Sequence, residues 1–148
     1  MSELRDLYQE VILDHYRHPR HHGRVEDASH QADGFNPLCG DRIHMTIKMD
    51  GDKVEEIAFE GAGCAISTAS ASLLTETVKG MDRKAAEELF ERFHRLVTTD
   101  EGDGDESLGK LAVFAGVREY PVRVKCATLA WHTLKAALEA EQESVTTE

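Results

Sequence analysis

Residues 43–49 alternate between apolar and polar side chains, with isoleucine or methionine at every second position. This period of two is typical of a strand that buries one face. The sequence Asp-Gly-Asp at 50–52 favours a hairpin turn, and residues 54–59 have the composition of a returning strand. Residues 30–36 are a weaker strand candidate, which Gly34 interrupts. The pattern therefore predicts a small three-stranded antiparallel sheet.

Apolar residues recur at helical spacing in much of the remaining chain. The first predicted helix ends near Arg17, because a proline two residues later disfavours its continuation, and the second covers residues 65–78. Asp82 is suited to cap a third helix, and Pro121 to the first turn of the last one. A short helical or irregular segment over 108–117 lies between them. Together these elements predict an α+β fold in which the sheet packs with about five helices.

The composition is that of an ordinary globular protein, and 148 residues are enough for one domain with a substantial core. We expect a single domain over 1–148, with a frayed polar tail at 139–148. The formal net charge of −11 argues against a nucleic-acid partner, because a phosphate backbone requires clustered Lys and Arg. No apolar run is long enough for a bilayer, and the N-terminus has no signal-peptide core. We therefore expect a soluble, cytoplasmic protein with no membrane partner.

The chain has three cysteines, and disulfides alone cannot use an odd number. Widely spaced cysteines in a reducing compartment more often serve metal binding or catalysis than crosslinking. The alternative is three buried, inert thiols. Cys39 and Asp41 lie at the start of the middle predicted strand, and Cys126 lies near the start of the last helix. Cys64 lies at a predicted helix N-terminus behind two glycines, where the helix dipole favours its thiolate form.

Zinc prefers four ligands in a tetrahedron, commonly thiolate, imidazole and sometimes carboxylate. Four residues supply such ligands if the ends of their elements meet: Cys39, Asp41, Cys64 and Cys126. No pair has the short gap of a zinc finger, so the prediction rests on their placement. A carboxylate among thiolates is the ligand most easily exchanged. We expect that a partner's histidine can shift the metal and free a thiolate to attack a persulfide sulfur. The alternative is a permanent structural zinc.

Two charged segments fall outside this constellation. Residues 18–24 form a basic, histidine-rich patch in an acidic protein. Such a tract can bind metal, and the alternative is a surface loop whose side chains serve the preceding helix or a partner. The acidic run at 100–106 has the composition of a calcium loop but lacks the ligand register of an EF-hand. We expect it to be an exposed loop.

The segments around the cysteines resemble the motifs of the U-type iron–sulfur cluster assembly family, which includes IscU and the N-terminal domain of NifU. They are Pro-Leu-Cys-Gly-Asp at 37–41, Gly-Ala-Gly-Cys-Ala-Ile-Ser at 61–67 and Arg-Val-Lys-Cys-Ala at 123–127. The resemblance covers nearly the whole chain, with the motifs in the same order. Within the family the chain is similar to the SufU branch rather than to the scaffold branch. Scaffold proteins have a histidine where this chain has Lys125, and a shorter interval between the second and third cysteines.

The resemblance implies a compact α+β domain and a zinc site formed by the residues that match Cys39, Asp41, Cys64 and Cys126. It implies Cys39 as the sulfur acceptor and Arg123 as a supporting residue near the site. It also implies a pyridoxal-phosphate cysteine desulfurase, SufS, as the persulfide donor, and we expect a downstream Suf scaffold to receive the sulfur. The chain is thus expected to act as a zinc-dependent sulfurtransferase.

Two other functions stay open on sequence grounds. The same cysteines could carry a [2Fe–2S] cluster, because thiolates also suit iron–sulfur clusters. Lys125 argues against this scaffold function without excluding it. The chain could also be a non-catalytic binding module that zinc merely stabilises.

Overall fold

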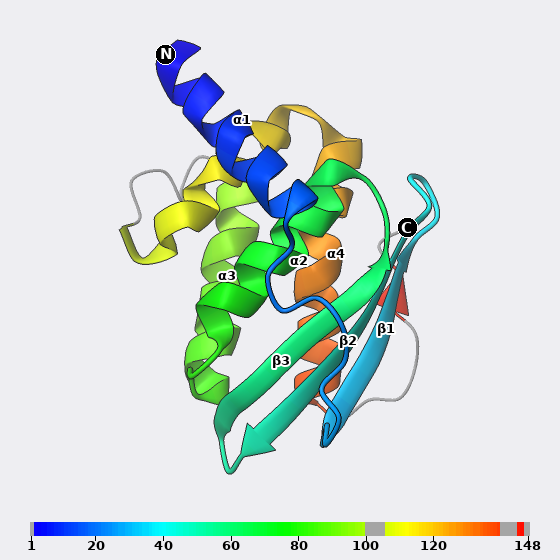
Figure 1. Ribbon diagram of the computed structural model, residues 1–148. Helices are drawn as coiled ribbons and strands as arrows, with labels where there is room; N and C mark the ends of the chain where they lie inside the picture. Colours follow the sequence, from blue (N-terminus) through cyan, green and yellow to red (C-terminus); the bar gives the residue numbers. More distant parts are fainter. Residues whose placement is uncertain (1, 100–105, 140–144, 147–148) are drawn as a thin grey trace.

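The β-sheet has the strand order β3-β2-β1-β4 in a computed structural model, shown in Figure 1. The structure describes residues 2–99, 106–139 and 145–146, with the side chains of residues 9–99 and 106–139. The strands are β1 His30–Asn36, β2 Asp41–Asp50, β3 Lys53–Ala62 and β4 Val145–Thr146. β2 pairs antiparallel with both β1 and β3, which confirms the predicted three-stranded sheet.

The short strand β4 pairs with β1 in the parallel sense, opposite Gly34 and Phe35. We expected a frayed tail over 139–148, and these two residues correct that expectation. The physical reason is that β1 would otherwise present an edge of unpaired N–H and C=O groups, which a short strand covers. The rest of the tail after Glu139 lies outside the described residues.

The opposite edge of the sheet, on β3, is covered by the histidine-rich segment 18–24. The backbone N–H of Gly23 donates to the carbonyl of Phe59 at 2.8 Å, and the N–H of Phe59 donates to the carbonyl of His21 at 3.0 Å. Among the described side chains, no histidine of this segment joins a group of potential metal ligands. The segment is therefore an edge cover that ties the first helix to the sheet.

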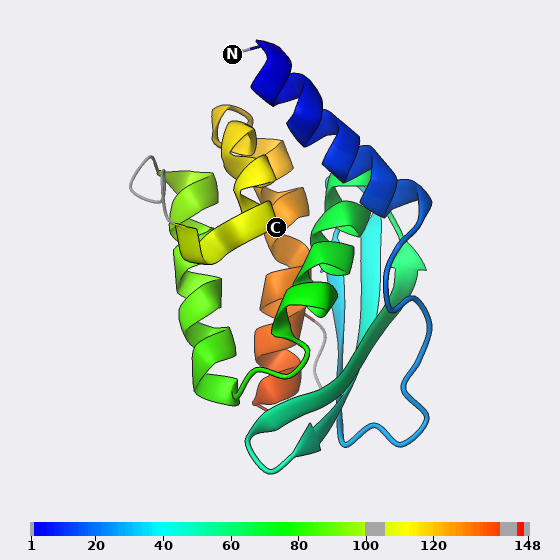
Figure 2. The ribbon, with the colours of Figure 1, turned by 60° about the vertical axis from the view of Figure 1, so that its left-hand side comes forward.

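Five helices lie on one side of the sheet in the part of the chain that the structure describes, as Figures 1 and 2 show. They are α1 Ser2–Arg17, α2 Ala65–Val78, α3 Arg83–Thr98, the 3-10 helical segment η1 Glu106–Glu119, which is kinked at Gly109, and α4 Pro121–Leu138. This arrangement confirms the predicted α+β fold. None of these helices has both the length and the apolar character needed to cross a membrane.

Helix α4 packs directly on β1, and the two elements come closest at Gly34. A Cβ at this position would lie 2.1 Å from Thr133 Oγ1 and 3.1 Å from Leu129 Cδ1. The expectation that Gly34 interrupts the strand is wrong, because β1 continues through Gly34 without a break. Glycine is needed here since the helix leaves no room for a side chain. The contact brings α4, which carries Cys126, against the strand that ends at Asn36.

The segment η1 packs back on the core through five buried apolar residues, as the pattern over 108–117 predicted. Its Phe114 lies edge-to-face against Phe93 of α3 with 5.8 Å between ring centroids, and Phe93 stacks on Trp131 of α4 at 4.7 Å. These aromatic contacts join three helices into one core. The acidic run expected to be an exposed loop falls mostly on residues 100–105, which lie outside the described part of the chain.

Candidate metal centre

Asp41 opens β2, and its side chain is completely buried. Its Oδ1 accepts a hydrogen bond from the backbone N–H of Cys64 at 2.8 Å, and its Oδ2 lies 3.3 Å from the amide nitrogen of Asn36. Among the described residues, no ion pair joins this carboxylate to a lysine or arginine. A buried carboxylate without a cationic partner is costly. A metal cation at this position would supply that partner.

The turn between β3 and α2 passes directly over this carboxylate. A Cβ at Gly63 would lie 2.7 Å from Asp41 Oδ1 and 3.2 Å from its Cγ. A Cβ at Gly61 would likewise meet the backbone carbonyl of Arg42. The two glycines before Cys64 were predicted to permit a close backbone approach, and this prediction is confirmed.

Cys64 is the N-cap of α2, where its Sγ accepts a hydrogen bond from the backbone N–H of Ser67 at 3.4 Å. Its predicted place at a helix N-terminus is therefore confirmed. A hydrogen bond from the Cys126 thiol, followed by the amide groups of Ser67 and Ile66, lowers the pKa of Cys64 to about 6 against the opposing effect of burial. The thiolate form of Cys64 is thus favoured near neutral pH.

Cys126 lies in the second turn of α4 and is fully buried. Its Sγ is 3.1 Å from the Sγ of Cys39, which is half-buried in the loop between β1 and β2. The hydrogen bond that Cys126 shares with Cys64, together with burial, raises the pKa of Cys126. Of these two thiols, Cys64 is thus the one that loses its proton more easily.

The predicted ligands converge from three separate segments of the chain. Ligand atoms of Cys39, Asp41 and Cys126 all lie within 4.8 Å of one another. Cys64 adjoins this group through Asp41, with 4.0 Å between its Sγ and the carboxylate Oδ2. Three sulfurs and one carboxylate oxygen form a donor set that suits zinc. We call these four residues the cysteine–aspartate cluster.

Asn36 also contacts this cluster, and the sequence did not predict it. It is completely buried at the end of β1, with its Nδ2 3.3 Å from Asp41 Oδ2 and 3.6 Å from Cys126 Sγ. The available signal was a polar side chain that directly precedes the first cysteine motif.

The sequence profile described as "NifU-like N terminal domain" matches residues 7–127 of this chain. The chain belongs to this family. The match confirms the resemblance carried by the three cysteine motifs. The chain is 43% identical over 141 residues to the zinc-dependent sulfurtransferase SufU of Bacillus subtilis, with 95% of each protein covered. It is 44% identical over 138 residues to the iron–sulfur cluster assembly scaffold protein IscU of Streptococcus pyogenes, with 93% of this chain and 86% of that protein covered.

Solved structures agree with the NifU-like fold. A putative iron–sulfur cluster assembly scaffold protein for the SUF system from Fervidobacterium islandicum is 37% identical, with a TM-score of 0.83 over 87% of this chain and 94% of that one. A NifU-like N-terminal protein from Brucella abortus also has a TM-score of 0.83, covering 91% of this chain and 94% of its own. Its sequence identity is 21%, so this second likeness shows the fold alone.

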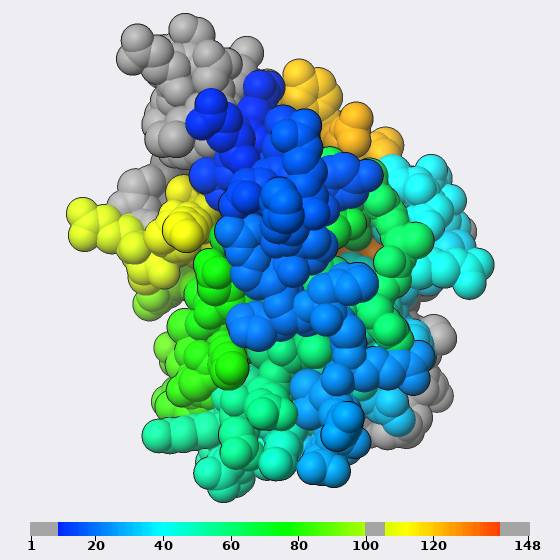
Figure 3. All heavy atoms as spheres, viewed as in Figure 1, coloured from blue at the N-terminus to red at the C-terminus, as the bar shows by residue number. Residues whose placement is uncertain are grey.

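In this NifU-like domain Arg123 lies on the surface rather than in the cluster. It is exposed in the first turn of α4, about one helical turn before Cys126. Figure 3 shows the start of α4 (orange) and the β1–β2 loop (cyan) reaching the surface at the same end of the molecule. The short distance between Cys39 and Cys126 joins these two segments beneath the surface.

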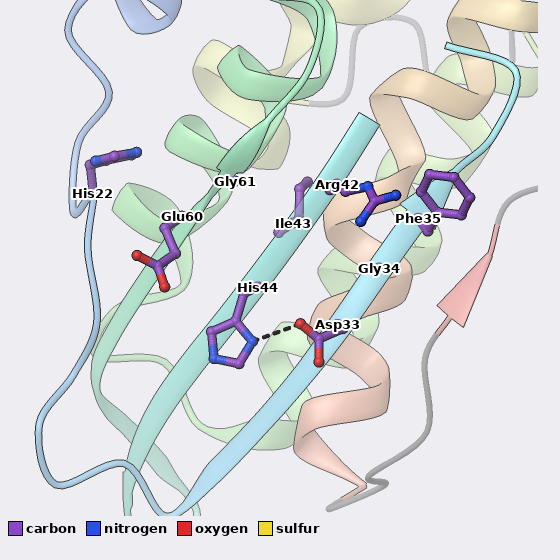
Figure 4. A pocket seen from close by; sticks show the side chains of 9 residues that line it. All are labelled: His22, Asp33, Gly34, Phe35, Arg42, Ile43, His44, Glu60 and Gly61. Atoms are coloured by element: carbon purple, nitrogen blue, oxygen red, sulfur yellow. Dashed lines mark hydrogen bonds and ion pairs between the residues drawn. The ribbon is translucent and has the colours of Figure 1, made fainter. Parts of the chain in front are cut away.

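A separate cavity of about 710 Å³ lies on the open face of the sheet, shown in Figure 4. There His44 Nδ1 lies 2.7 Å from Asp33 Oδ1, and the guanidinium of Arg42 lies 5.0 Å from the ring centroid of Phe35. No residue of the cysteine–aspartate cluster lines this cavity. The candidate metal centre is instead a largely buried cluster at the rim of the sheet.

Proposed function

We propose that this protein is a zinc-dependent sulfur acceptor for iron–sulfur cluster assembly, which takes sulfur from a cysteine desulfurase. The observation that carries the proposal is the convergence of three thiols and the buried carboxylate of Asp41. The relative from Bacillus subtilis, named a zinc-dependent sulfurtransferase, is similar along 95% of both chains. Lys125, in the position where scaffold proteins have a histidine, supports the same branch of the family.

Zinc would be held by the three cysteines and Asp41, and when bound it supplies the positive charge that stabilises thiolates and a buried carboxylate. Asp41 and Cys126 are fully buried. Cys39 is half-buried in a loop whose neighbouring residues Leu38 and Gly40 are exposed. Cys64 is also half-buried, but its neighbours Gly63 and Ala65 are less exposed than Leu38 and Gly40, so we assign Cys39 as the sulfur that the persulfide of a partner reaches.

The transfer step is an exchange at a sulfur–sulfur bond. The Cys39 thiolate attacks the outer sulfur of the desulfurase cysteine persulfide, and a new S–S bond forms on Cys39. The bond between that sulfur and the desulfurase cysteine breaks, and the desulfurase cysteine leaves as a thiolate. No external oxidant or reductant is needed. Arg123, exposed beside the cluster, offers positive charge to the anionic persulfide as it approaches.

Mass spectrometry after incubation with a pyridoxal-phosphate cysteine desulfurase and free cysteine tests this assignment. We expect one extra sulfur atom on the peptide that contains Cys39, and faster desulfurase turnover. Cys39→Ala should abolish both effects. Asp52→Ala, in the exposed turn at the other end of β2, is a matched control that should retain both. Loading that persists without Cys39 would sink the assignment of the acceptor sulfur, whereas a natural chain that takes no sulfur and leaves desulfurase turnover unchanged would be a module that zinc only stabilises.

A scaffold that carries a [2Fe–2S] cluster is the second candidate function. The scaffold name of the relative from Streptococcus pyogenes and the affinity of thiolates for iron–sulfur clusters favour it. Metal analysis of protein purified without added iron separates the two functions. Stoichiometric zinc in a colourless protein supports sulfur transfer, whereas a coloured, labile cluster supports scaffolding.

A further inference from the structure

Asn36 is the only asparagine in the chain and the last residue of β1. It is completely buried, and its side chain contacts Asp41, Cys126 and the backbone of Leu38. We propose that Asn36 is a positioning residue of the sulfur-acceptor site. Its amide group holds Asp41 and Cys126 in place relative to each other and anchors the loop that carries Cys39. This inference rests on the metal site proposed above.

The contacts around Asn36 leave one orientation for its amide group. Its Oδ1 accepts a hydrogen bond from the backbone N–H of Leu38 at 3.3 Å. Its Nδ2 donates toward Asp41 Oδ2 at 3.3 Å and toward Cys126 Sγ at 3.6 Å. A flipped amide would place its oxygen against the carboxylate and the sulfur, and its NH2 group against an N–H donor. The contacts to Leu38 and to Asp41 would then be lost, so the NH2 group of the amide faces the cluster.

The amide of Asn36 stabilises the cluster without adding charge to it. Three thiolates and a carboxylate carry more negative charge than one divalent cation cancels, and uncancelled charge is costly in a buried site. N–H donors to charged acceptors form stronger hydrogen bonds than donors to neutral ones. Loss of such a group beside metal ligands typically weakens metal binding by about 10–100-fold.

The hydrogen bond to Leu38 extends the influence of Asn36 to the acceptor sulfur. An asparagine that bonds the backbone two residues further on shapes a local turn. Cys39 follows Leu38 directly, and this turn brings its Sγ to 3.1 Å from that of Cys126. One side chain thus orients two buried ligands and the loop that presents the third.

Two substitutions separate these roles. Asn36→Asp keeps an oxygen for Leu38 but sets a second oxygen against Asp41 and Cys126. We expect its zinc affinity, measured by competition with a chelator, to fall at least about tenfold. Asn36→Ala removes the loop contact as well, and we expect it also to change the rate at which iodoacetamide modifies Cys39 in zinc-free protein.

Ser70→Ala is the matched control for these variants. The Ser70 hydroxyl is buried and donates to the carbonyl of Ala127 in α4 at 2.6 Å, one residue beyond Cys126. Its loss removes a buried hydrogen bond beside the site without removing a contact to the cluster. We expect Ser70→Ala to keep the zinc affinity of the natural chain.

Selective ¹⁵N-asparagine labelling of the unsubstituted chain gives a direct readout, because Asn36 alone contributes side-chain amide signals. We expect two inequivalent N–H signals that shift when zinc is added. Signals that do not respond to zinc would show that the amide does not bond the residues that hold the metal. This measurement needs no variant, so it holds even where Asn36→Ala or Asn36→Asp fails to fold.

Unshifted amide signals in a chain that does bind zinc would overturn the role of Asn36. An Asn36→Asp variant that folds and keeps the natural zinc affinity would overturn it equally. Neither result would contradict the proposed function, because the unsubstituted chain would still bind zinc and accept sulfur. A natural chain that binds no zinc and accepts no sulfur would instead refute the proposed function, and the role of Asn36 with it.

Discussion

The close approach of Gly63 to Asp41 makes Gly63→Ala a direct test of the metal centre. The added Cβ would lie 2.7 Å from Asp41 Oδ1 and 3.2 Å from its Cγ, which is closer than such atoms pack. The φ of Gly63 is not positive, so alanine brings no left-handed strain to the backbone. The effect of the substitution therefore falls on the carboxylate.

The size of the effect follows from how firmly Asp41 is held. It has no exposed surface, and the N–H of Cys64 fixes its Oδ1 at 2.8 Å. Overpacking at such a buried position costs about 1–3 kcal/mol of stability in the zinc-free protein. A displaced carboxylate also binds zinc less well. Each tenfold loss of affinity removes about 1.4 kcal/mol of the stabilisation that excess zinc provides.

Urea unfolding with and without zinc measures both parts of this prediction. The gain in free energy of unfolding on adding zinc should be at least about 1.4 kcal/mol smaller in Gly63→Ala than in the natural chain. Gly116→Ala is the control, because a Cβ at Gly116 meets no atom within 4 Å. An equal zinc-dependent gain in Gly63→Ala and the natural chain would show that Asp41 is not a zinc ligand.

Three further measurements test other parts of the structure. Burial lowers the pKa of His15, so the contribution of its neutral form to the free energy of unfolding is complete above about pH 6.5 and is lost as the pH falls. His15→Asn should make the free energy of unfolding of zinc-free protein, measured in urea, fall less steeply as the pH is lowered. An unchanged slope would contradict this prediction. Gly34→Ala should cost about 1–3 kcal/mol, and less in a Thr133→Ala background because Thr133 Oγ1 is what the new Cβ meets; additive costs in the double-mutant cycle would count against this contact. Removing zinc with a chelator should lower the thermal midpoint and open the buried Cys126 to alkylation. A midpoint that does not move would favour inert thiols.

Elements with strong local signals were predictable from the sequence. The alternation over 43–49 and the turn at 50–52 identify the β2–β3 hairpin, because strand period and turn chemistry are local properties. Asp82 caps α3 through the N–H of Ala85, as its residue type predicted. The place of Cys64 at a helix N-terminus follows from the same kind of reasoning.

Features that depend on distant parts of the chain were not predictable in this way. Gly34 looked like a break in a strand, because nothing near it in sequence shows that α4 lies on top of it. The pairing of residues 145–146 with β1 joins segments that no local pattern connects. The role of Asn36 was not predictable for the same reason, since one of the two cluster residues it contacts, Cys126, comes from the far end of the chain.

The core contact at Gly34 and the metal centre share one pair of elements. On α4, Thr133 lies over Gly34 about two helical turns after Cys126, which contacts Asn36 two residues further along β1. We therefore expect the close packing of Thr133 on Gly34 to influence how near Cys126 comes to Asp41. An alanine at Gly34 that pushes α4 outward should weaken zinc binding although no ligand has changed, and Thr133→Ala should restore it. Chelator competition on the single and double variants measures this coupling. An unchanged zinc affinity in Gly34→Ala would show that the cluster adjusts independently of the core.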